Sequence, residues 1–387
     1  MKKFSLFILF LVFLLAACGK VEKKEENSIL PIPTKAKDTS AVKYAKGFTI
    51  SKENNLTVIK VSSPWPESEK EFSYALIDRD KLASITIDVN AYDAIIAVPV
   101  ERCVVTSTTH IPALEALNVA ERLVGFPGTK YISSTKTREL IENGKVRELG
   151  KNEAINTEVL IDLAPELVVG FSINNHNKAY ETIQKSGIPV VYNGDWTEQS
   201  PLGKAEWIKF FAPFFKKEKL ADSLFSSIEN QYIEAKTIAS GYDKQPTVLA
   251  GSMYKDIWYL PAGNSWAAQF IEDANANYLW QDSEGTGSLS LNLENVLDKG
   301  READYWIGPG QFTSYAQMIS AHQLYSKFNS FKNHTIFTYS SVKGETGGLL
   351  YYELAPNRPD LVLKDLISIL HPNALPDHEL VFFKPLE

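Results

Sequence analysis

Residues 157–170 read TEVLIDLAPELVVG, and residues 293–308 read LENVLDKGREADYWIG. Each segment has a Glu at its second position, two aliphatic residues, an Asp and, after a short gap, an apolar run that ends in Gly. A short amphipathic run followed by a continuous apolar run is typical of a helix that leads into a buried strand. The repetition therefore predicts the same helix-strand unit at equivalent places in two related lobes.

The chain after residue 99 alternates short apolar runs with amphipathic ones, which is typical of an α/β fold with parallel sheets. For the first lobe (99–216) we predict strands at 103–107, 122–126, 167–171 and 188–192 and helices at 111–117, 157–163 and 178–186. For the second lobe (241–387) we predict strands at 247–250, 305–308 and 336–339 and helices at 266–274, 293–297 and 360–370. Both lobes are therefore expected to be Rossmann-like.

Two further segments complete the predicted architecture. Residues 217–240 carry apolar side chains at helical spacing, and no Gly or Pro interrupts them. They predict one helix of roughly 35 Å that joins the lobes as a stiff connector. In residues 41–98, strand-like runs at 56–61 and 71–76 predict a small β extension in front of the main fold.

The first residues resemble a secretion signal (1–18) with a lipid-attachment site. Two lysines precede an apolar run at 4–15 that is too short to span a membrane. LAAC at 15–18 resembles a bacterial lipobox, in which the Cys18 thiol receives a diacylglyceryl group; the alternative is an ordinary signal with a chance cysteine. Residues 19–40 are charged, polar and proline-bearing, which predicts a disordered spacer. We therefore expect a lipid-anchored protein rather than one that crosses a membrane.

The composition limits the partners and the chemistry. The net charge of -7 argues against nucleic acid as a partner, because nucleic-acid binding needs a basic surface. Cys103 is the one cysteine besides Cys18, so stability is expected to come from a packed core, with Cys103 as a buried, inert thiol. The 7 Trp and 17 Tyr exceed what a core needs, and the surplus is available to line a binding cleft.

From about residue 99 to its end, the chain resembles the substrate-binding proteins of ABC importers for metal chelates, the group that handles ferric siderophores, haem and cobalamin. The stretches that carry the resemblance are NTEVLIDLAPELV (156–168), LENVL (293–297), TSTTH (106–110) and WYLPAGNSW (258–266). The sequence departs from the family in residues 44–98 and in the segment GETGGLLYYE (344–353). These departures leave the identity of the chelate open.

The resemblance implies a receptor outside the cytoplasm, anchored by lipid to a bacterial membrane, that holds a chelate between two lobes. It also implies that Glu158 and Glu294 dock on arginines of an importer permease, which works with its ATPase. The alternative for each Glu is a favourable interaction with the helix dipole in a first helical turn. Surface capture of a ligand without a permease is a further possibility within the same class.

Ligand contacts are expected from loops at the carboxyl ends of the strands, where open α/β sheets place their crevices. Aromatic side chains there suit a macrocycle or a catechol-type chelate, although core packing explains any one of them equally well. The candidates in the first lobe are Thr108, Thr109, His110, Tyr131 and Trp196, and those in the second are Tyr254, Trp258, Trp266, Trp306, Tyr339 and Glu353.

Two polar candidates have structural alternatives, and for His110 the structural alternative is preferred. His110 follows three hydroxyl residues at a strand-to-helix turn, so it is either an axial ligand to a haem or cobalt centre or part of a helix start. Arg358 opens the last predicted helix. It either pairs with Glu353 across the cleft, meets an anionic chelate, or forms a local ion pair of little energetic value.

No metal site, cofactor or catalytic motif is predicted. The six histidines show no tight ligand spacing, and the chain lacks the hydrolase elbow, phosphate loop and zinc-protease motifs. A binding protein is therefore preferred over an enzyme. The rival hypothesis is an extracytoplasmic hydrolase on a two-lobed α/β frame that uses Glu353 with His110.

Overall fold

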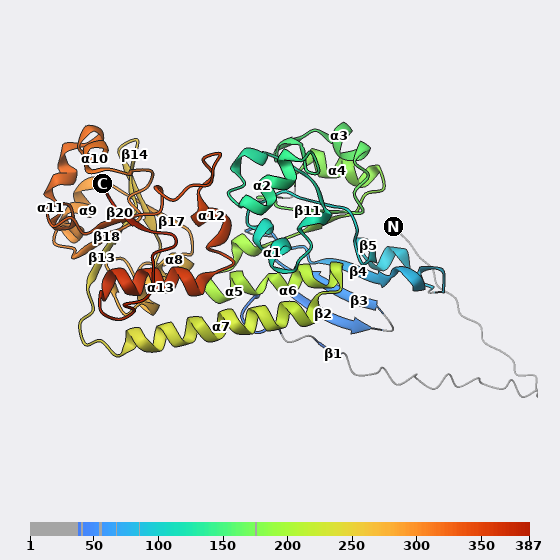
Figure 1. Cartoon of the computed structure of the whole chain (residues 1–387), viewed down its shortest axis with the longest axis horizontal. Helices are drawn as coiled ribbons and strands as arrows, with labels where there is room; N and C mark the ends of the chain where they lie inside the picture. The colour runs from blue at the N-terminus through green and yellow to red at the C-terminus, as the bar shows by residue number, and fades with distance from the viewer. Residues whose placement is uncertain (1–37, 40–41, 54–55, 67, 85, 175) are drawn as a thin grey trace, which may run out of the picture. The chain divides into compact units, whose positions relative to one another are not determined.

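A parallel five-stranded sheet forms the centre of the first lobe in the computed structural model (Figure 1). The strand order is β12-β11-β6-β7-β8, and all neighbouring strands run parallel. The strands are β6 Cys103–Val105, β7 Leu123–Phe126, β8 Arg147–Glu148, β11 Leu167–Gly170 and β12 Val190–Tyr192. The connecting helices are α1 His110–Ala116, α2 Thr135–Glu142, α3 Thr157–Asp162 and α4 Lys178–Lys185. The predicted parallel sheet of this lobe is confirmed.

The structure describes residues 38–39, 42–53, 56–66, 68–84, 86–174 and 176–387. The predicted signal, Cys18 and most of the predicted spacer lie outside these residues. No helix in the described part of the chain has both the length and the apolar character that a membrane crossing needs. The described residues form one compact unit, so the boundaries drawn from the sequence at 98, 216 and 240 stay predictions.

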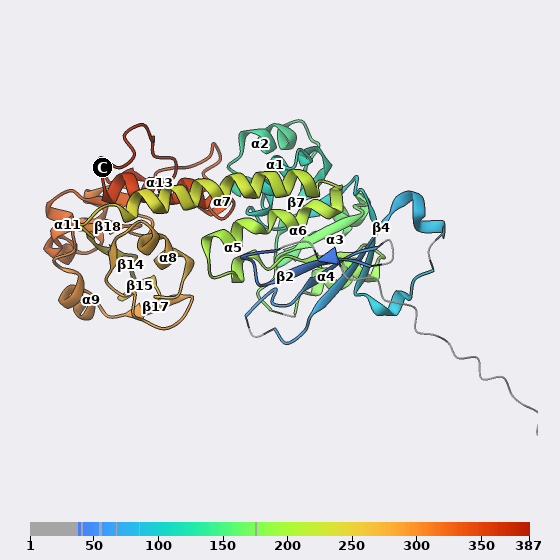
Figure 2. The same cartoon turned by 90° about the horizontal axis from the view of Figure 1, so that it is seen from below.

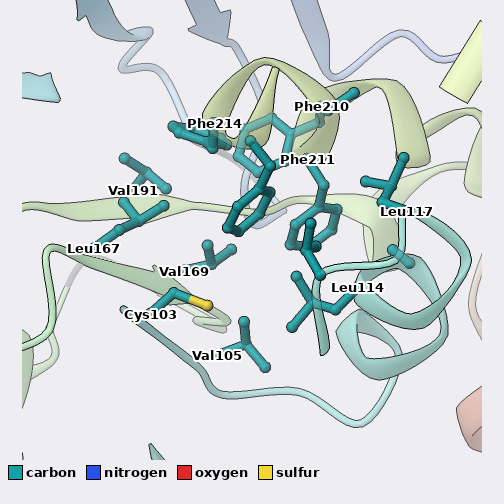
Figure 3. Packing of buried hydrophobic residues seen from close by; sticks show 14 of the residues in the cluster. Cys103, Val105, Leu114, Leu117, Leu167, Val169, Val191, Phe210, Phe211 and Phe214 are labelled. Carbon is teal, nitrogen blue, oxygen red and sulfur yellow. The ribbon is translucent and has the colours of Figure 1, made fainter. Parts of the chain in front are cut away.

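Both faces of the first sheet are buried, which explains why its strands are uninterrupted apolar runs. In β6, Cys103 and Val105 face one hydrophobic cluster and Val104 faces another, because side chains alternate along a strand. Figure 3 shows the first cluster, where Phe211 and Phe214 pack over the strands. Burial raises the pKa of the Cys103 thiol to about 12, so the predicted buried thiol is confirmed.

The predicted N-terminal β extension is present as a second five-stranded sheet. Its strands are β1 Asp38–Thr39, β2 Phe48–Glu53, β3 Leu56–Val61, β4 Phe72–Asp78 and β5 Ala94–Val98. They pair antiparallel except for β5, which runs parallel to β4. Side chains such as Phe48, Ile59 and Tyr74 belong to the same hydrophobic cluster as β6 and β11. The extension therefore shares the core of the first lobe.

Two buried carboxylates hold the start of the extension against the helices that follow the first lobe. Glu206, at the end of α5 (Pro201–Glu206), accepts hydrogen bonds from the backbone N–H groups of residues 43–45 at 2.6 to 3.0 Å. Glu198 accepts from the N–H groups of Lys46 and Gly47, each at 2.8 Å. Because one carboxylate satisfies several backbone donors, the chain enters the fold at a fixed place.

Helix α7 (Glu218–Ser240) contributes to two hydrophobic cores. Ala221 and Phe225, in its first half, belong to the cluster of the first lobe. Tyr232, Ala235 and Ala239, in its second half, belong to the cluster of the second lobe. Figures 1 and 2 show α7 running alongside elements of both lobes, with α13 (Pro359–Leu370) packed against it. The predicted connecting helix is therefore confirmed.

The second lobe has a sheet of order β16-β13-β18-β19-β20. Its strands are β13 Thr247–Ala250, β16 Asn277–Tyr278, β18 Tyr305–Ile307, β19 Ile336–Thr338 and β20 Lys384–Pro385. The first four run parallel, and the edge strand β20 is antiparallel to β19. The helices are α8 Trp266–Asp273, α9 Leu293–Gly300, α10 Tyr315–Ala321, α11 Asn329–Lys332, α12 Leu350–Leu354 and α13. This sheet matches the predicted strands, except that β16 and β20 were not predicted.

A small antiparallel sheet in the second lobe was not predicted either. It consists of β14 Ser252–Tyr254, β15 Ile257–Pro261 and β17 Ser288–Leu291. In β15, Trp258 and Leu260 are buried while Ile257 and Tyr259 are exposed, as the two-residue period of a strand requires. The sheet extends the lobe beyond the end of β13 and provides part of the wall of a cavity.

Replacing Glu206 should test how firmly the extension is held. Glu206→Ala leaves the N–H groups of residues 43–45 without their acceptor, so we expect the free energy of unfolding in urea to fall by about 3 kcal/mol. Glu234→Ala, an exposed position on α7, is the matched control and should change it by less than about 0.5 kcal/mol. Equal effects of the two substitutions would contradict this account.

Candidate functional site

The order of strands in the first lobe creates a crevice at the carboxyl ends of β6 and β11. The chain passes from β6 to β7 on one side and later returns to β11 on the other, so the connecting helices diverge at this point. A cavity of about 1070 Å³ lies here. Thr106 and Ser107, which follow β6, and Phe171, which follows β11, are part of its wall.

The second lobe repeats this arrangement at the carboxyl ends of β13 and β18, which are also neighbours at a reversal of strand order. A cavity of about 840 Å³ lies there, lined by Gly251 and Ser252 after β13 and by Gly308 after β18. The two lobes thus each place a cavity at the position where this kind of sheet binds ligands.

The two cavities share part of one wall. Leu349 and Tyr352 line both of them. Leu349 ends, and Tyr352 follows, a turn that we call the interlobe hairpin (residues 343–349). In this hairpin Gly344 N–H donates to Gly348 O at 2.8 Å, and Lys343 pairs with Leu349. All but the first residue of this hairpin lies within the segment that departs from the family pattern (344–353), and the structure places the hairpin against the first lobe.

Four hydrogen bonds connect residues 346–357 of the second lobe with the first lobe. The Thr346 hydroxyl donates to Lys130 O at 2.8 Å, and the Asn357 amide donates to Thr109 O at 2.8 Å. The carboxylate of Glu353 accepts from the N–H groups of Ser133 at 2.5 Å and Ser134 at 2.9 Å, which lie at the amino terminus of α2. The carboxyl of Glu353 thereby satisfies two backbone N–H groups at the start of α2 and joins the two lobes.

Glycine is required where the interlobe hairpin meets the first lobe. A Cβ atom on Gly344 would lie 2.5 Å from Ser133 Cα, and one on Gly348 would lie 2.3 Å from Tyr131 O. Both distances are shorter than any normal contact. The two glycines therefore allow the backbones of the two lobes to approach closely.

The surroundings of Glu353 change its acidity. Burial raises the pKa of its carboxyl from 4.5 to about 7, and the nearby Glu115 carboxylate adds to the rise, while the N–H groups of Ser133 and Ser134 oppose it. Glu353 is 2% exposed. Part of the population of this residue is therefore protonated near neutral pH.

Several predicted ligand contacts line the cavities. Thr108 and Tyr131 are in the wall of the cavity in the first lobe. Tyr254, Trp266 and Tyr339 are in the wall of the cavity in the second lobe. These five side chains come from loops or element ends, and the fold brings them to the two crevices.

Other aromatic candidates lie away from both cavities in this structure. Trp258 and Trp306 are fully buried and stack on each other with ring centroids 5.2 Å apart. Their indole N–H groups donate to Ala250 O and Gly251 O, which makes complete burial of both rings favourable. Trp196 donates to Pro64 O and packs on Phe171, one layer behind the first cavity. These three rings therefore have packing contacts in this structure, and their contact with a ligand stays a prediction.

Of the polar candidates, Thr109 and Arg358 have polar partners in the structure, and His110 packs against an aromatic ring. Thr109 accepts the Asn357 hydrogen bond described above through its carbonyl oxygen. His110 is completely buried with its ring 5.4 Å from that of Phe211, and burial lowers its pKa to about 4.

Arg358 forms a bidentate ion pair with the buried Asp360, with distances of 2.9 and 2.7 Å. The structure thus shows the local ion pair, and a contact of Arg358 with an anionic chelate stays a prediction. Glu353 and His110 have separate surroundings, one at the amino terminus of α2 and the other in the core, so no observation favours the hydrolase hypothesis.

Sequence reasoning missed several residues that line the cavities, among them Lys130, Lys151, Tyr259, Phe312 and Tyr352. The alternation of exposed and buried positions in β15 was a usable signal for Tyr259, because it places this ring on the face opposite Trp258. The unusual segment 344–353 was a usable signal for Tyr352. No local pattern distinguishes the two lysines.

Glu158 and Glu294 lie at matching places in the two lobes. Each is the second residue of a short helix, α3 or α9, and each helix leads into a strand of the parallel sheet of its lobe. Asn156 and Asn292 cap the two helices by accepting a hydrogen bond from the N–H three residues later. Both glutamates are exposed, and within the described residues neither has an ion-pair partner. The predicted repeat of the helix-strand unit is confirmed.

A comparison with protein families shows which family the chain belongs to. The sequence model described as periplasmic binding protein matches residues 103–342. The chain belongs to the periplasmic binding protein family. The resemblance drawn from the sequence is thereby confirmed for the family, and the two cavities lie in the lobes on which this family is built.

Relatives and solved structures agree with this family. An uncharacterized lipoprotein of Methanocaldococcus jannaschii is 28% identical over 298 residues, which cover 75% of this chain and 69% of the relative. A second lipoprotein of that organism is 21% identical over 390 residues, covering 96% and 95% of the two chains.

Among solved structures, a possible iron-binding periplasmic solute-binding protein of Staphylococcus epidermidis has a TM-score of 0.56 at 20% identity, covering 70% of this chain and 99% of that one. A periplasmic haem-binding protein of Vibrio cholerae has a TM-score of 0.53 at 16% identity, covering 68% and 99%. At these identities the structures support the fold of this periplasmic binding protein.

The pH dependence of stability should reveal the contribution of Glu353. Because its folded-state pKa is raised from 4.5 to about 7, its contribution to stability is fully present below pH 4.5 and is lost as the pH rises through 7. The free energy of unfolding of the wild type should therefore fall between pH 4.5 and 8. This fall should be larger than that of Glu353→Gln, which cannot titrate, by on the order of 3 kcal/mol. Urea denaturation at several pH values measures this difference.

The control for this experiment is Glu345→Gln, an exposed position in the interlobe hairpin, which should keep the pH dependence of the wild type. If Glu353→Gln also keeps that dependence, the carboxyl of Glu353 titrates normally and the account of its surroundings is wrong.

Proposed function

We propose that this protein is a lipid-anchored receptor that captures a metal chelate between its two lobes and delivers it to the permease of an ABC importer. The observation that carries the proposal is the pair of cavities, one at the strand ends of each lobe, which meet along the wall formed by Leu349 and Tyr352. A ligand that occupies both cavities would touch both lobes at once. Binding would then favour the arrangement in which the lobes are in contact.

The names of relatives support the ligand class and the location. Proteins of similar fold are described as iron-binding, as in Staphylococcus epidermidis, or haem-binding, as in Vibrio cholerae and in Roseiflexus. Two relatives of similar sequence are described as lipoproteins, which supports an anchor at Cys18 and a place outside the cytoplasm. The lining of the cavities by rings and hydroxyl groups suits the organic part of a chelate.

We further propose that Thr108 and Tyr131 contact the chelate from the first lobe and that Tyr254, Trp266, Tyr339 and Tyr352 contact it from the second. Tyr339 and Tyr352 face each other with hydroxyl oxygens 3.2 Å apart, so a polar group of a ligand can bond to both. Trp266 lines the second cavity, which makes its fluorescence a reporter of occupancy.

Native ligand should be found on the protein purified from its own cells. We expect an absorption band of a coloured chelate and one bound molecule per chain by native mass spectrometry. Adding that chelate to the emptied protein should change the tryptophan fluorescence in the wild type, and the change should be smaller in Trp266→Phe. Chemical conversion of the chelate or of an added ester would favour an enzyme and contradict the receptor.

The glutamates of the repeated unit are proposed to dock on the permease. Two exposed carboxylates without ion-pair partners in the described residues can each form a bidentate pair with an arginine. In cells, the double substitution Glu158→Lys and Glu294→Lys should lower uptake of the ligand at least about tenfold, while its affinity for the purified protein stays within about twofold.

Glu181→Lys is the matched control for the docking experiment, because Glu181 is also an exposed glutamate in the first turn of a helix, α4. It should leave uptake unchanged. Loss of ligand affinity in the double variant would instead place the two glutamates near the ligand, and unchanged uptake would remove them from the docking surface.

A further inference from the structure

The two cavities differ in their charged residues. The residues that line the cavity of the second lobe, all within the described part of the chain, include no Asp, Glu, Lys, Arg or His. They include nine aromatic side chains: Tyr254, Tyr259, Trp266, Phe270, Phe312, Tyr339, Tyr351, Tyr352 and Phe383. The cavity of the first lobe is lined by two lysines, Lys130 and Lys151, and two glutamates, Glu148 and Glu153.

We infer that the protein selects chelates without net charge, whose apolar or aromatic periphery fills the cavity of the second lobe. This inference rests on the proposed function, because it specifies the chemical class of the chelate that the receptor holds. It concerns the charge of the ligand, which neither the fold nor the family determines.

The charges of the first cavity balance. Glu148 accepts hydrogen bonds from Gly128 N–H, Gly150 N–H and Thr129, at 2.6 to 2.8 Å. Burial alone would raise the pKa of Glu148, but these donors hold it below its ordinary value, so the carboxylate is ionised. Two negative and two positive side chains therefore line this cavity, and they provide no excess positive charge for an anion.

Two further lysines lie next to aromatic rings of the second cavity, but outside its lining. The Lys204 ammonium lies 5.2 Å from the ring of Trp266 and donates to the carbonyl oxygens of Asp195 and Trp196, at 3.0 and 3.1 Å. The exposed Lys255 lies 5.3 Å from the ring of Tyr254. Lys204 thus directs its donors to protein carbonyls, and Lys255 keeps its charge in solvent.

The electrostatic cost of an anionic chelate decides the selection. Moving a charged group from water into an uncharged aromatic cavity costs several kcal/mol unless an opposite charge accompanies it. A ferric tris-catecholate carries three negative charges, because each catechol loses two protons, whereas a ferric tris-hydroxamate carries none. The net charge of -7 on the whole chain repels the anion further. The neutral complex therefore enters without an uncompensated charge.

A binding panel with the full-length protein in detergent tests this inference. The probes are a ferric tris-hydroxamate and cyanocobalamin, which are neutral, and a ferric tris-catecholate and haem, which are anionic. We expect at least one neutral probe to bind at least about tenfold more tightly than both anionic probes. We also expect its affinity to be independent of salt concentration, as for a complex without net charge.

The outcomes separate the inference from the proposed function. Tighter binding of an anionic probe overturns the inference and leaves a chelate receptor in place. Failure of all four probes contradicts the proposed function and the inference with it.

A positive charge added to the lining of the second cavity should weaken the preference for neutral chelates. Gln311 lines this cavity and is exposed, so Gln311→Lys should fold normally and raise the affinity for the ferric tris-catecholate about tenfold. Gln323→Lys is the control, because it changes the net charge equally at an exposed position outside both linings. Equal gains in the two variants would show that only the overall charge matters, which contradicts selection by the cavity.

Discussion

The sharing of helix α7 between two hydrophobic cores is the constraint on which the rest of the structure depends. Phe225 is buried with the first lobe and Tyr232 with the second, only two helical turns apart. A helix that is packed at both ends cannot bend without exposing apolar surface of one core or the other. The helix therefore limits the distance between the lobes. The carboxyl ends of the strands in both sheets lie towards a common space.

The contact across that space depends on few groups. Glu353 at the amino terminus of α2 and the close approach of Gly344 to Ser133 join the lobes opposite a stiff connector. A carboxylate that is partly protonated near neutral pH contributes a variable amount to this contact. Leu349, at the end of the interlobe hairpin, and Tyr352 line both cavities, which differ in their charged residues. The contact between the lobes and the shape of the ligand space are therefore coupled through residues 343–352.

Much of the fold was predictable because its signals are local. The apolar runs of β6 and β11 are buried on both faces, and a run of that kind is recognisable without knowledge of its neighbours. The candidate site was only partly predictable. Tyr254 and Trp266 line a cavity, but Trp258, from the same stretch of sequence, is in the core, since strand alternation and a hydrogen bond to Ala250 O turn it inward. Composition alone does not separate such neighbours.

The sequence by itself determined the two α/β lobes, the connecting helix and the matching positions of Glu158 and Glu294, because periodicity and helix caps act over a few residues. Only the tertiary structure decided which side chains share a cavity and where the lobes touch. Glu353 and Ser133 are 220 residues apart in the chain, and no local pattern records their hydrogen bond. The difference in charge between the two cavities likewise arises from residues that meet only after the sheets have formed, since each wall combines several loops from distant parts of the sequence.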